Sequence, residues 1–324
     1  MPRLTEYTKY DDAQKYFSKE ALWQLFDGNK NELNISYECL DRHPRINTAV
    51  RICYEKNPSR SISFGELIDN SNRFANWLLH KGKQKGDRIA IMLDPSIEFY
   101  TALFGTMKAG CVAVPLFTAF GPDGLMARLK DCQPSLLILA PEKSALSSAV
   151  KIETVIGDRA LMEELDDFDD EFISNTHSSD MAMYQYTSGT SRELPEAVKH
   201  RHRAIVTVMI AALYATGVRP GDKYMCPSSP AWGHGLWHGT LAPLALGIEI
   251  ATYSGKFDPD RLLGALEEFE TTNLSAAATH YRMMRNLQES GPRNFKINKL
   301  SVSYTHLRAH ETDSYLVCRL LLEK

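Results

Sequence analysis

The clearest pattern of hydrophobic and polar positions in the chain lies between residues 63 and 82. Apolar residues recur there three and four positions apart, which is the spacing of one face of an α-helix. Ser63 and Glu66 have the spacing of a capping box, and Gly82 is a typical stop signal. The pattern predicts an amphipathic helix with Phe64, Leu67, Ile68, Ser71, Phe74, Ala75, Leu78 and Leu79 on one face.

Short apolar runs alternate with helical patterns after this segment. Strands are predicted at residues 88–93, 111–117 and 134–140, and helices at residues 96–110 and 121–133. Strands that are apolar on both faces and alternate with helices are typical of a parallel sheet covered by helices. The alternation therefore predicts an α/β fold built from βαβ units.

A second α/β block begins near residue 200. Residues 204–218 are mostly apolar but too few to cross a bilayer comfortably, so they predict a buried helix. Residues 223–254 are expected to form a strand, an irregular aromatic loop, a helix and a strand. Residues 258–287 are expected to add a helix, a strand and a further helix.

Composition restricts the function classes. The 324 residues are 44% hydrophobic and 24% charged, enough for one large or two medium domains, and the net charge is −3. Basic residues are scattered, which argues against a nucleic-acid or anionic-membrane partner. The N-terminus lacks a signal-peptide core, so we expect a soluble, cytoplasmic protein without a membrane span. No tight spacing joins the six cysteines, which favours reduced thiols: Cys39, Cys53, Cys111, Cys132, Cys226 and Cys318.

An acidic run, "EELDDFDDEF", occupies residues 163–172. Such runs usually form a solvated loop or a helix end. We favour that interpretation over a metal site.

A cluster of hydroxyl side chains lies in "YQYTSGTSRELPEAVKH", residues 184–200. Several backbone N–H groups and four hydroxyls gather in one small volume, which suits the many acceptor oxygens of a phosphate chain. The alternative is an ordinary surface turn. The GxxxxGK[ST] pattern of a P-loop is absent, and the expected arrangement is strand, loop, strand. The cluster consists of Thr187, Ser188, Gly189, Thr190 and Ser191.

These residues resemble the phosphate-binding signature of the adenylate-forming superfamily, which includes acyl-CoA synthetases, adenylation domains of peptide synthetases, and luciferases. Tyr186, the cluster of residues 187–191, Pro195 and His202 match the signature. Arg192 stands where the family usually has glycine, an extra residue precedes Pro195, and Glu196 replaces the usual lysine. These departures remove an easy positive-φ position and bring an anion near the phosphates. Lys199 and Arg192 are candidates to compensate.

Other segments agree with this resemblance in the same order. Residues 86–117 look like the family's stretch before the signature, residues 273–284 like its acyl-pocket strand and helix, and "NISYECLDRHP" like the opening of acetyl- and medium-chain acyl-CoA synthetases. The resemblance implies two stacked α/β subdomains with largely parallel sheets, truncated relative to the family's N-terminal domain. We expect residues 1–199 and 200–303 to form them. Residues 304–324 look like translated sequencing-library adapter, the alternative being an amphipathic helix.

The resemblance implies a two-step reaction. A carboxylic acid attacks Mg-ATP to give an acyl-adenylate and pyrophosphate, and coenzyme A then takes the acyl group. Thr187, Ser188, Gly189, Thr190, Ser191 and Lys199 are the implied nucleotide-binding residues, with Thr190 also near Mg²⁺. In the family the catalytic lysine, the magnesium-site glutamate and the ribose-binding aspartate follow the point where the resemblance ends. The catalytic residues of this chain are therefore unknown, and we expect an N-terminal fragment that is inactive alone.

The segment "PSSPAWGHGLWHGTLAPLALG", residues 227–247, allows three interpretations. Its glycines are loosely spaced like a dinucleotide motif, but Pro227 and Pro230 disrupt the strand that should precede it. His234 and His238 are spaced like zinc ligands, but the general-base glutamate is missing. In the resembling synthetases this segment and the later acyl-pocket helix lie beside the acid. The substrate-binding candidates are thus Trp232, His234, Gly235, Trp237 and Thr279, unless they are plain core.

The absence of an acidic residue between positions 228 and 246 bears on the substrate. An amino-acid adenylation domain would normally carry an aspartate there to pair with the ammonium group. An acid with an uncharged tail is therefore favoured. A non-catalytic nucleotide-binding or scaffold protein is the other alternative, for which Arg192 and Glu196 are the best support.

Overall fold

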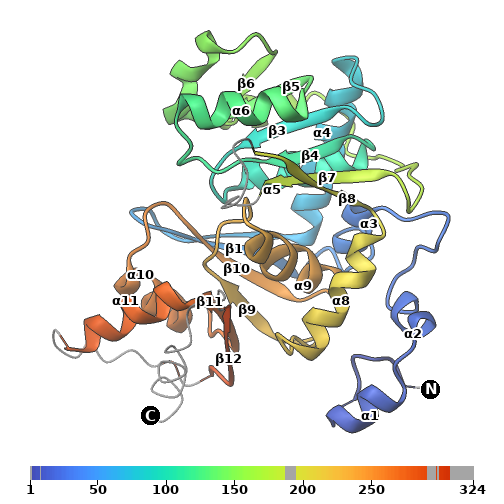
Figure 1. Cartoon of the computed structure of the whole chain (residues 1–324), viewed down its shortest axis with the longest axis vertical. Helices are drawn as coiled ribbons and strands as arrows, with labels where there is room; N and C mark the ends of the chain where they lie inside the picture. The colour runs from blue at the N-terminus through green and yellow to red at the C-terminus, as the bar shows by residue number, and fades with distance from the viewer. Residues whose placement is uncertain (1, 8, 187–194, 290–296, 298, 307–324) are drawn as a thin grey trace.

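Two six-stranded sheets, stacked one above the other, form the centre of the computed structural model (Figure 1). The structure describes residues 2–7, 9–186, 195–289, 297 and 299–306. The hydroxyl cluster at residues 187–191 therefore lies outside the described residues, as does Arg192. The predicted α/β class is confirmed.

The first sheet contains the βαβ units that the alternating pattern predicts. Its order is β6-β5-β3-β4-β7-β8, and only the β7–β8 pair is antiparallel. β7 and β8 are the two strands on either side of residues 187–196, so the two predicted strands are confirmed. The strands are β3 (Arg88–Met92), β4 (Val112–Pro115), β5 (Leu136–Leu139), β6 (Thr154–Ile156), β7 (Met181–Tyr186) and β8 (Ala197–Arg201).

Helix α4 (Phe64–His80) is the predicted amphipathic helix, and the side chains of Ser63 and Glu66 form the capping box. It packs against α5 (Ile97–Lys108) at a glycine. A Cβ on Gly105 would lie 2.7 Å from Cβ of Phe74, so only glycine permits this approach. The other helical segments of this half are α6 (Pro122–Cys132), the 3₁₀ segment η1 (Pro141–Ala149) and α7 (Arg159–Leu165).

The second sheet has the order β12-β11-β9-β10-β1-β2. Its strands are β1 (Thr48–Tyr54), β2 (Arg60–Ser63), β9 (Lys223–Cys226), β10 (Glu249–Ser254), β11 (Asn273–Ala277) and β12 (Val302–His306). β1 pairs in parallel with β10, so an early segment joins strands found two hundred residues later. The division into residues 1–199 and 200–303 stays a prediction. The two sheets do not divide at that point, because β1 and β2 belong to the second sheet. β12 continues to His306, whereas residues 307–324 are outside the described part.

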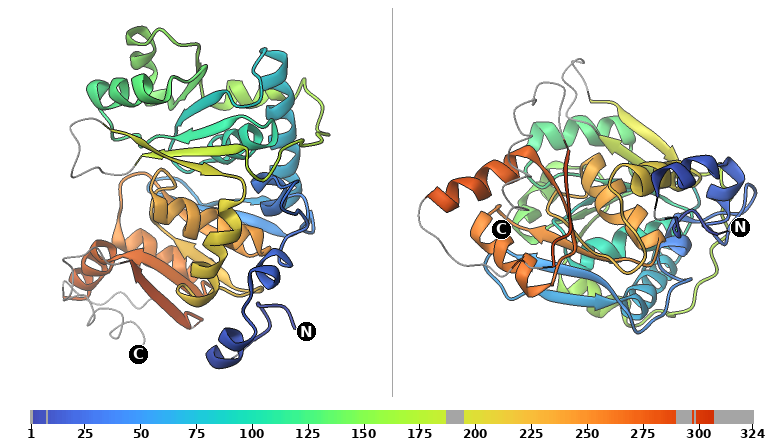
Figure 2. Two further views of the ribbon diagram at one scale, coloured as in Figure 1. Left: turned by 45° about the vertical axis from the view of Figure 1, so that its right-hand side comes forward. Right: turned by 90° about the horizontal axis from the view of Figure 1, so that it is seen from below.

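The helices of the second half are α8 (Ala204–Tyr214), the π-helix η2 (His234–Leu241), α9 (Ala242–Ala245), α10 (Pro259–Glu268) and α11 (Ala278–Glu289). α8 is shorter than the predicted helix over residues 204–218, because the chain turns at Gly217 with a φ of +68°. The N-terminal helices are α1 (Tyr10–Lys15), α2 (Lys19–Trp23) and α3 (Ile35–Cys39). Figure 2 shows α1 and α2 beside the lower layer, where the Tyr214 hydroxyl donates to the Ala13 carbonyl at 3.2 Å.

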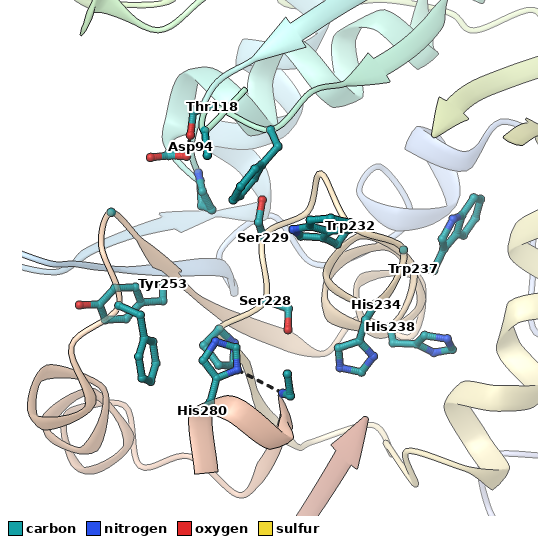
Figure 3. A pocket seen from close by; sticks show the side chains of 18 of the residues that line it. Asp94, Thr118, Ser228, Ser229, Trp232, His234, Trp237, His238, Tyr253 and His280 are labelled. Atoms are coloured by element: carbon teal, nitrogen blue, oxygen red, sulfur yellow. Dashed lines mark hydrogen bonds between the residues drawn. The ribbon is translucent and has the colours of Figure 1, made fainter. Parts of the chain in front are cut away.

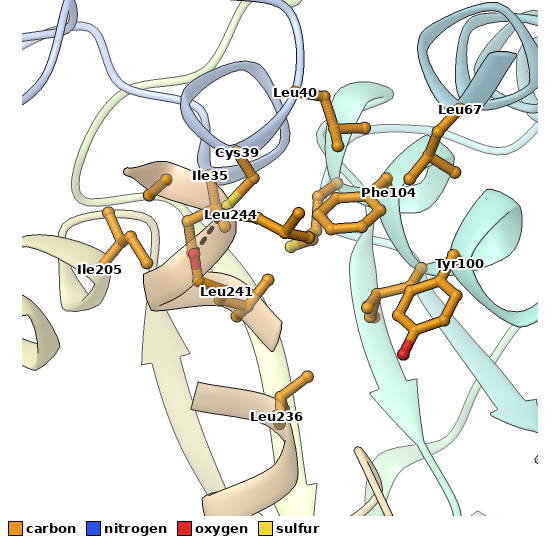
Figure 4. Packing of buried hydrophobic residues seen from close by; sticks show 14 of the residues in the cluster. Ile35, Cys39, Leu40, Leu67, Tyr100, Phe104, Ile205, Leu236, Leu241 and Leu244 are labelled. Carbon is orange, nitrogen blue, oxygen red and sulfur yellow. Dashed lines mark hydrogen bonds between the residues drawn. The ribbon is translucent and has the colours of Figure 1, made fainter. Parts of the chain in front are cut away.

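One hydrophobic core extends across both layers (Figure 4). Ile35 and Cys39 of α3 pack between Phe104 of α5 and Leu244 of α9, and all four side chains are fully buried. The Cys39 thiol donates to the Leu241 carbonyl at 3.3 Å. The two layers therefore share buried apolar surface, which holds their facing loops in fixed relative positions.

The acidic run begins in the last turn of α7, continues beyond its end and lies along α4. Asn76 donates to the carbonyls of Asp169 and Glu171, and Arg73 pairs with Asp166 at 3.3 Å. The described residues contain no cluster of three potential metal ligands. Within the same residues no helix is long and apolar enough to cross a membrane. Five cysteines, Cys39, Cys53, Cys111, Cys132 and Cys226, are buried and form no disulfide.

Candidate functional site

A cavity of about 1360 Å³ lies where the two sheets face each other (Figure 3). The segments after β3, β4 and β5 supply Asp94, Thr118 and, from η1, Lys143. The segments after β9, β10 and β11 supply, among others, Ser228, Lys256 and, from the start of α11, Thr279. The carboxyl ends of six parallel strands thus meet at one site, which is where α/β proteins bind ligands.

The π-helix η2 forms one wall of this cavity. It presses closely on the loop after β9, because a Cβ on Gly235 would lie 2.3 Å from the carbonyl oxygens of Ser228 and Ser229. Gly239 also lies close to Cys226, whose sulfur would be 2.8 Å from an added Cβ. Both glycines therefore face the loop and strand, while His234, Trp237 and His238 line the cavity. π-Helical segments are rare and frequently occur at functional sites.

Four histidines line the cavity. A hydrogen bond of 2.9 Å joins Nε2 of His234 to the Ser275 hydroxyl, and the His234 and His238 rings lie 5.7 Å apart. The backbone N–H of Ala277 donates to Nδ1 of His280 at 3.1 Å. Burial lowers the pKa of His280 to about 4 and also lowers the pKa of His200. His280 is therefore neutral at pH 7, and it serves as a hydrogen-bonding wall rather than as a cation.

Aromatic rings line two sides of the cavity. The rings of Phe117 and Trp232 lie 5.7 Å apart on one side. On another side Phe257 contacts Tyr253 at 5.6 Å and His280 at 4.5 Å. The polar groups differ in kind, because the Thr118 hydroxyl donates to Asp94 at 2.6 Å whereas Lys143 and Lys256 bring positive charge. The cavity therefore combines apolar walls with two lysines that suit an anion and with the carboxylates of Asp94 and Glu142.

The structure brings most of the predicted acid-binding residues together. Trp232, His234, Trp237 and Thr279 all line the cavity. Gly235 does not line it, because it packs against the loop after β9. Its contribution is to let η2 approach that loop.

Of the predicted nucleotide-binding residues, the structure describes only Lys199. Thr187, Ser188, Gly189, Thr190 and Ser191 lie outside the described residues, and so does the proposed contact of Thr190 with Mg²⁺. Lys199 lies on β8 with its Nζ 5.1 Å from the centre of the Tyr184 ring. It lines a separate cavity of about 470 Å³ with Lys85 and Arg88. Its nucleotide role stays a prediction.

Sequence reasoning missed several residues that line the cavity. The sequence did not predict a role for the hydrogen-bonded pair Asp94 and Thr118. It also did not predict a role for His200, Tyr253, Phe257 and His280. Most of them come at or just after the carboxyl end of a predicted strand, which is the signal that could have found them.

This geometry defines the class of protein. The fold is that of the N-terminal domains of adenylate-forming enzymes, and a ligand cavity opens between its two sheets. Residues 39–310 match the sequence model of the family described as AMP-binding enzyme, and the chain belongs to that family.

Several proteins are similar to this chain. The acetyl-coenzyme A synthetase of Bacillus subtilis is 27% identical over 297 residues, which cover 85% of this chain and 51% of that protein. A 3-hydroxybenzoate/4-hydroxybenzoate–CoA ligase of Thauera aromatica is 28% identical over 239 residues, which cover 69% of this chain and 45% of the ligase. The crystal structure of a Brucella canis acyl-CoA synthetase superposes with a TM-score of 0.80 at 26% identity, covering 87% of this chain and 54% of that one. The chain thus spans about half the length of the relatives it matches.

Proposed function

We propose that this chain supplies the ATP-binding and acid-binding part of an acyl-CoA synthetase. The reaction is the activation of a carboxylic acid by ATP to an acyl-adenylate, followed by thioester formation with coenzyme A. The observation that carries the proposal is the meeting of six strand ends at one cavity, directly beside the hairpin whose residues match the phosphate-binding signature. The relatives named acetyl-coenzyme A synthetase and hydroxybenzoate–CoA ligase support the same reaction class.

The described residues fit an anionic nucleotide beside an organic acid. Lys143, Lys256 and the hydroxyls of Ser228 and Ser229 line the same cavity, and such donors suit phosphate oxygens. Thr187, Ser188, Thr190 and Ser191 would hold the β- and γ-phosphates, and Thr190 would approach Mg²⁺. When bound, ATP supplies the leaving group that a carboxylate lacks. The protein's part is to position the two anions and offset their charge.

The acid is proposed to lie against the wall formed by Trp232, His234 and Trp237. Apolar rings dominate this wall, and η2 carries no acidic side chain that could pair with an ammonium group. We therefore favour a carboxylic acid with an uncharged tail over an amino acid. Burial of apolar tail surface against these rings would supply binding free energy of about 25 cal/mol per Å².

The proposal is tested by isothermal titration calorimetry of the chain with Mg-ATP and with acetyl- and benzoyl-sulfamoyl adenosine. These two sulfamoyl adenosines mimic acyl-adenylates. We expect the acyl analogues to bind more tightly than ATP, because they occupy both the nucleotide and the acid region. An aminoacyl-sulfamoyl adenosine is the control, and tighter binding of that compound would favour the amino-acid adenylation alternative. Absence of binding by Mg-ATP and by every analogue would contradict the proposal and support the non-catalytic scaffold alternative.

A further inference from the structure

The indole N–H of Trp237 donates a hydrogen bond of 3.0 Å to the side-chain oxygen of Gln185. Gln185 is the second-last residue of β7, in the first sheet, and Trp237 lies on η2, which packs on the second sheet. The bond therefore crosses from the strand that enters the signature loop to the wall of the cavity.

The burial of this pair makes the choice of glutamine unusual. Gln185 is 4% exposed and Trp237 is 7% exposed. An indole N–H can only donate, so it fixes the amide with its oxygen toward Trp237. Nε2 of Gln185 then has no hydrogen-bond partner among the described residues. Because an unsatisfied buried donor costs free energy, packing alone does not explain a glutamine at this position.

Trp237 is held from both arms of the hairpin. Gln185 of β7 bonds its indole N–H, while the ring of His200 on β8 lies 4.8 Å from its ring. Gln185 and Val198 face each other in the β7–β8 register, so the two contacts come from neighbouring positions of the same ladder. Figure 3 shows Trp237 at the end of the cavity opposite Tyr253. A shift of the hairpin would therefore displace this wall.

We propose that Gln185 is a positioning residue that fixes the Trp237 indole as a wall of the acid pocket. It thereby couples the acid pocket to the hairpin that carries the hydroxyl cluster. This inference rests on the proposed function. The consequence is that loss of the Gln185 amide weakens binding of the acyl group but leaves binding of ATP itself unchanged.

Three variants of the full 324-residue chain test this: Gln185→Leu, Trp237→Phe and the double variant. Gln185→Leu leaves the indole N–H without its acceptor, and it is expected to lower the unfolding midpoint. It should also raise the Kd for benzoyl-sulfamoyl adenosine about tenfold, with the Kd for Mg-ATP within twofold of wild type. The double variant removes both partners, so its midpoint should return toward that of Trp237→Phe. Its Kd for the analogue should stay raised.

A second indole bond provides the matched control. Trp77 donates to a Glu164 carboxylate oxygen at 2.7 Å, and neither residue lines the cavity. Glu164→Leu orphans that indole N–H and should lower the unfolding midpoint without changing the Kd for the analogue. Comparison with this variant distinguishes the effect of losing any indole hydrogen bond from the effect of losing the Trp237–Gln185 bond beside the cavity.

Two results would overturn the inference while the proposed function stands. In the first, Gln185→Leu binds benzoyl-sulfamoyl adenosine as tightly as wild type. In the second, the double variant regains wild-type affinity together with its midpoint, which would make the bond purely structural. By contrast, failure of the wild-type chain to bind either Mg-ATP or the analogue would overturn the proposed function and this inference together.

Discussion

The phenolic hydroxyl of Tyr186 donates a 2.7 Å hydrogen bond to Oδ2 of Asp131, and the backbone N–H of Ala197 donates to the same oxygen at 3.2 Å. Tyr186 and Ala197 face each other at the end of the β7–β8 ladder that adjoins residues 187–196. Burial and the hydrogen bond to Asp131 raise the pKa of Tyr186, so its hydroxyl remains a donor at neutral pH. The carboxylate of Asp131 on α6 thus binds the residues that flank the signature loop, residues 187–196, on both sides.

Replacing Asp131 with alanine is expected to weaken the attachment of β7 and β8 to α6 at Tyr186 and Ala197. The Ala197 N–H loses its acceptor, and the Tyr186 hydroxyl keeps only the Arg128 carbonyl at 3.0 Å. The free energy of unfolding should fall by about 1–3 kcal/mol in urea denaturation. Binding of Mg-ATP should weaken as well, because the residues that flank the signature loop lose a shared hydrogen-bond acceptor. Asp123→Ala, on the exposed first turn of the same helix, is the control and should cost at most a few tenths of a kcal/mol. Equal effects of the two substitutions would contradict this role for Asp131.

Substitution of Gly235 by alanine should displace η2. The added Cβ would lie 2.3 Å from two backbone carbonyl oxygens, and backbone does not yield as a side chain does. We expect a loss of about 1–3 kcal/mol or more in unfolding free energy, together with weaker binding of the acyl analogues. Gly124→Ala is the matched control. It lies in α6, where the nearest atom to an added Cβ is 3.6 Å away, and alanine there should stabilise the protein by about 0.5–1 kcal/mol.

Stability is expected to fall as the pH drops from about 6.5 to about 4. His202 is fully buried, its Nδ1 accepts the Ile35 N–H at 3.1 Å, and burial lowers its pKa from 6.5 to about 4. Between these values the unfolded chain binds a proton that the native chain does not. The stabilisation is therefore complete above pH 6.5 and is lost as the pH falls, by up to about 1.4 kcal/mol per pH unit.

His202→Gln tests this dependence, because glutamine keeps an acceptor and has no proton to gain in this range. Urea denaturation at pH 7 and pH 5 should show a smaller pH slope for the variant than for wild type. Some slope should remain, since burial also lowers the pKa values of His43 and His280 to about 4. An unchanged slope in His202→Gln would show that this histidine does not titrate as its burial implies.

The capping box of α4 offers a further test of stability. The Ser63 hydroxyl accepts the Glu66 N–H at 3.1 Å, and the Glu66 carboxylate accepts the Ser63 N–H at 2.8 Å. Ser63→Ala is expected to cost about 0.5–2 kcal/mol in thermal or urea unfolding. Ser61→Ala, at an exposed position on β2, should have little effect. A similar loss in both variants would argue against the cap.

The local elements could be predicted because their signals are local. The period of apolar residues between 64 and 79 and the Ser63–Glu66 spacing gave α4 with its cap. The apolar runs gave β3, β4 and β5. Trp232, His234 and Trp237 were found through their resemblance to a family segment, and they line one cavity. The position of Gly235 was found in the same way, but its contacts depend on the loop after β9, which the segment does not contain.

The sequence by itself determined the family, helices such as α4 and strands such as β3, β4 and β5, since periodicity, caps and short motifs are properties of neighbouring residues. Tertiary structure alone decided that β1 pairs with β10, that His200 and His280 line the cavity, and that Trp237 bonds to Gln185, 52 residues away. The physical reason is that contacts between distant residues depend on how whole sheets pack and share a core. No local preference of Gln185 or Trp237 encodes their meeting.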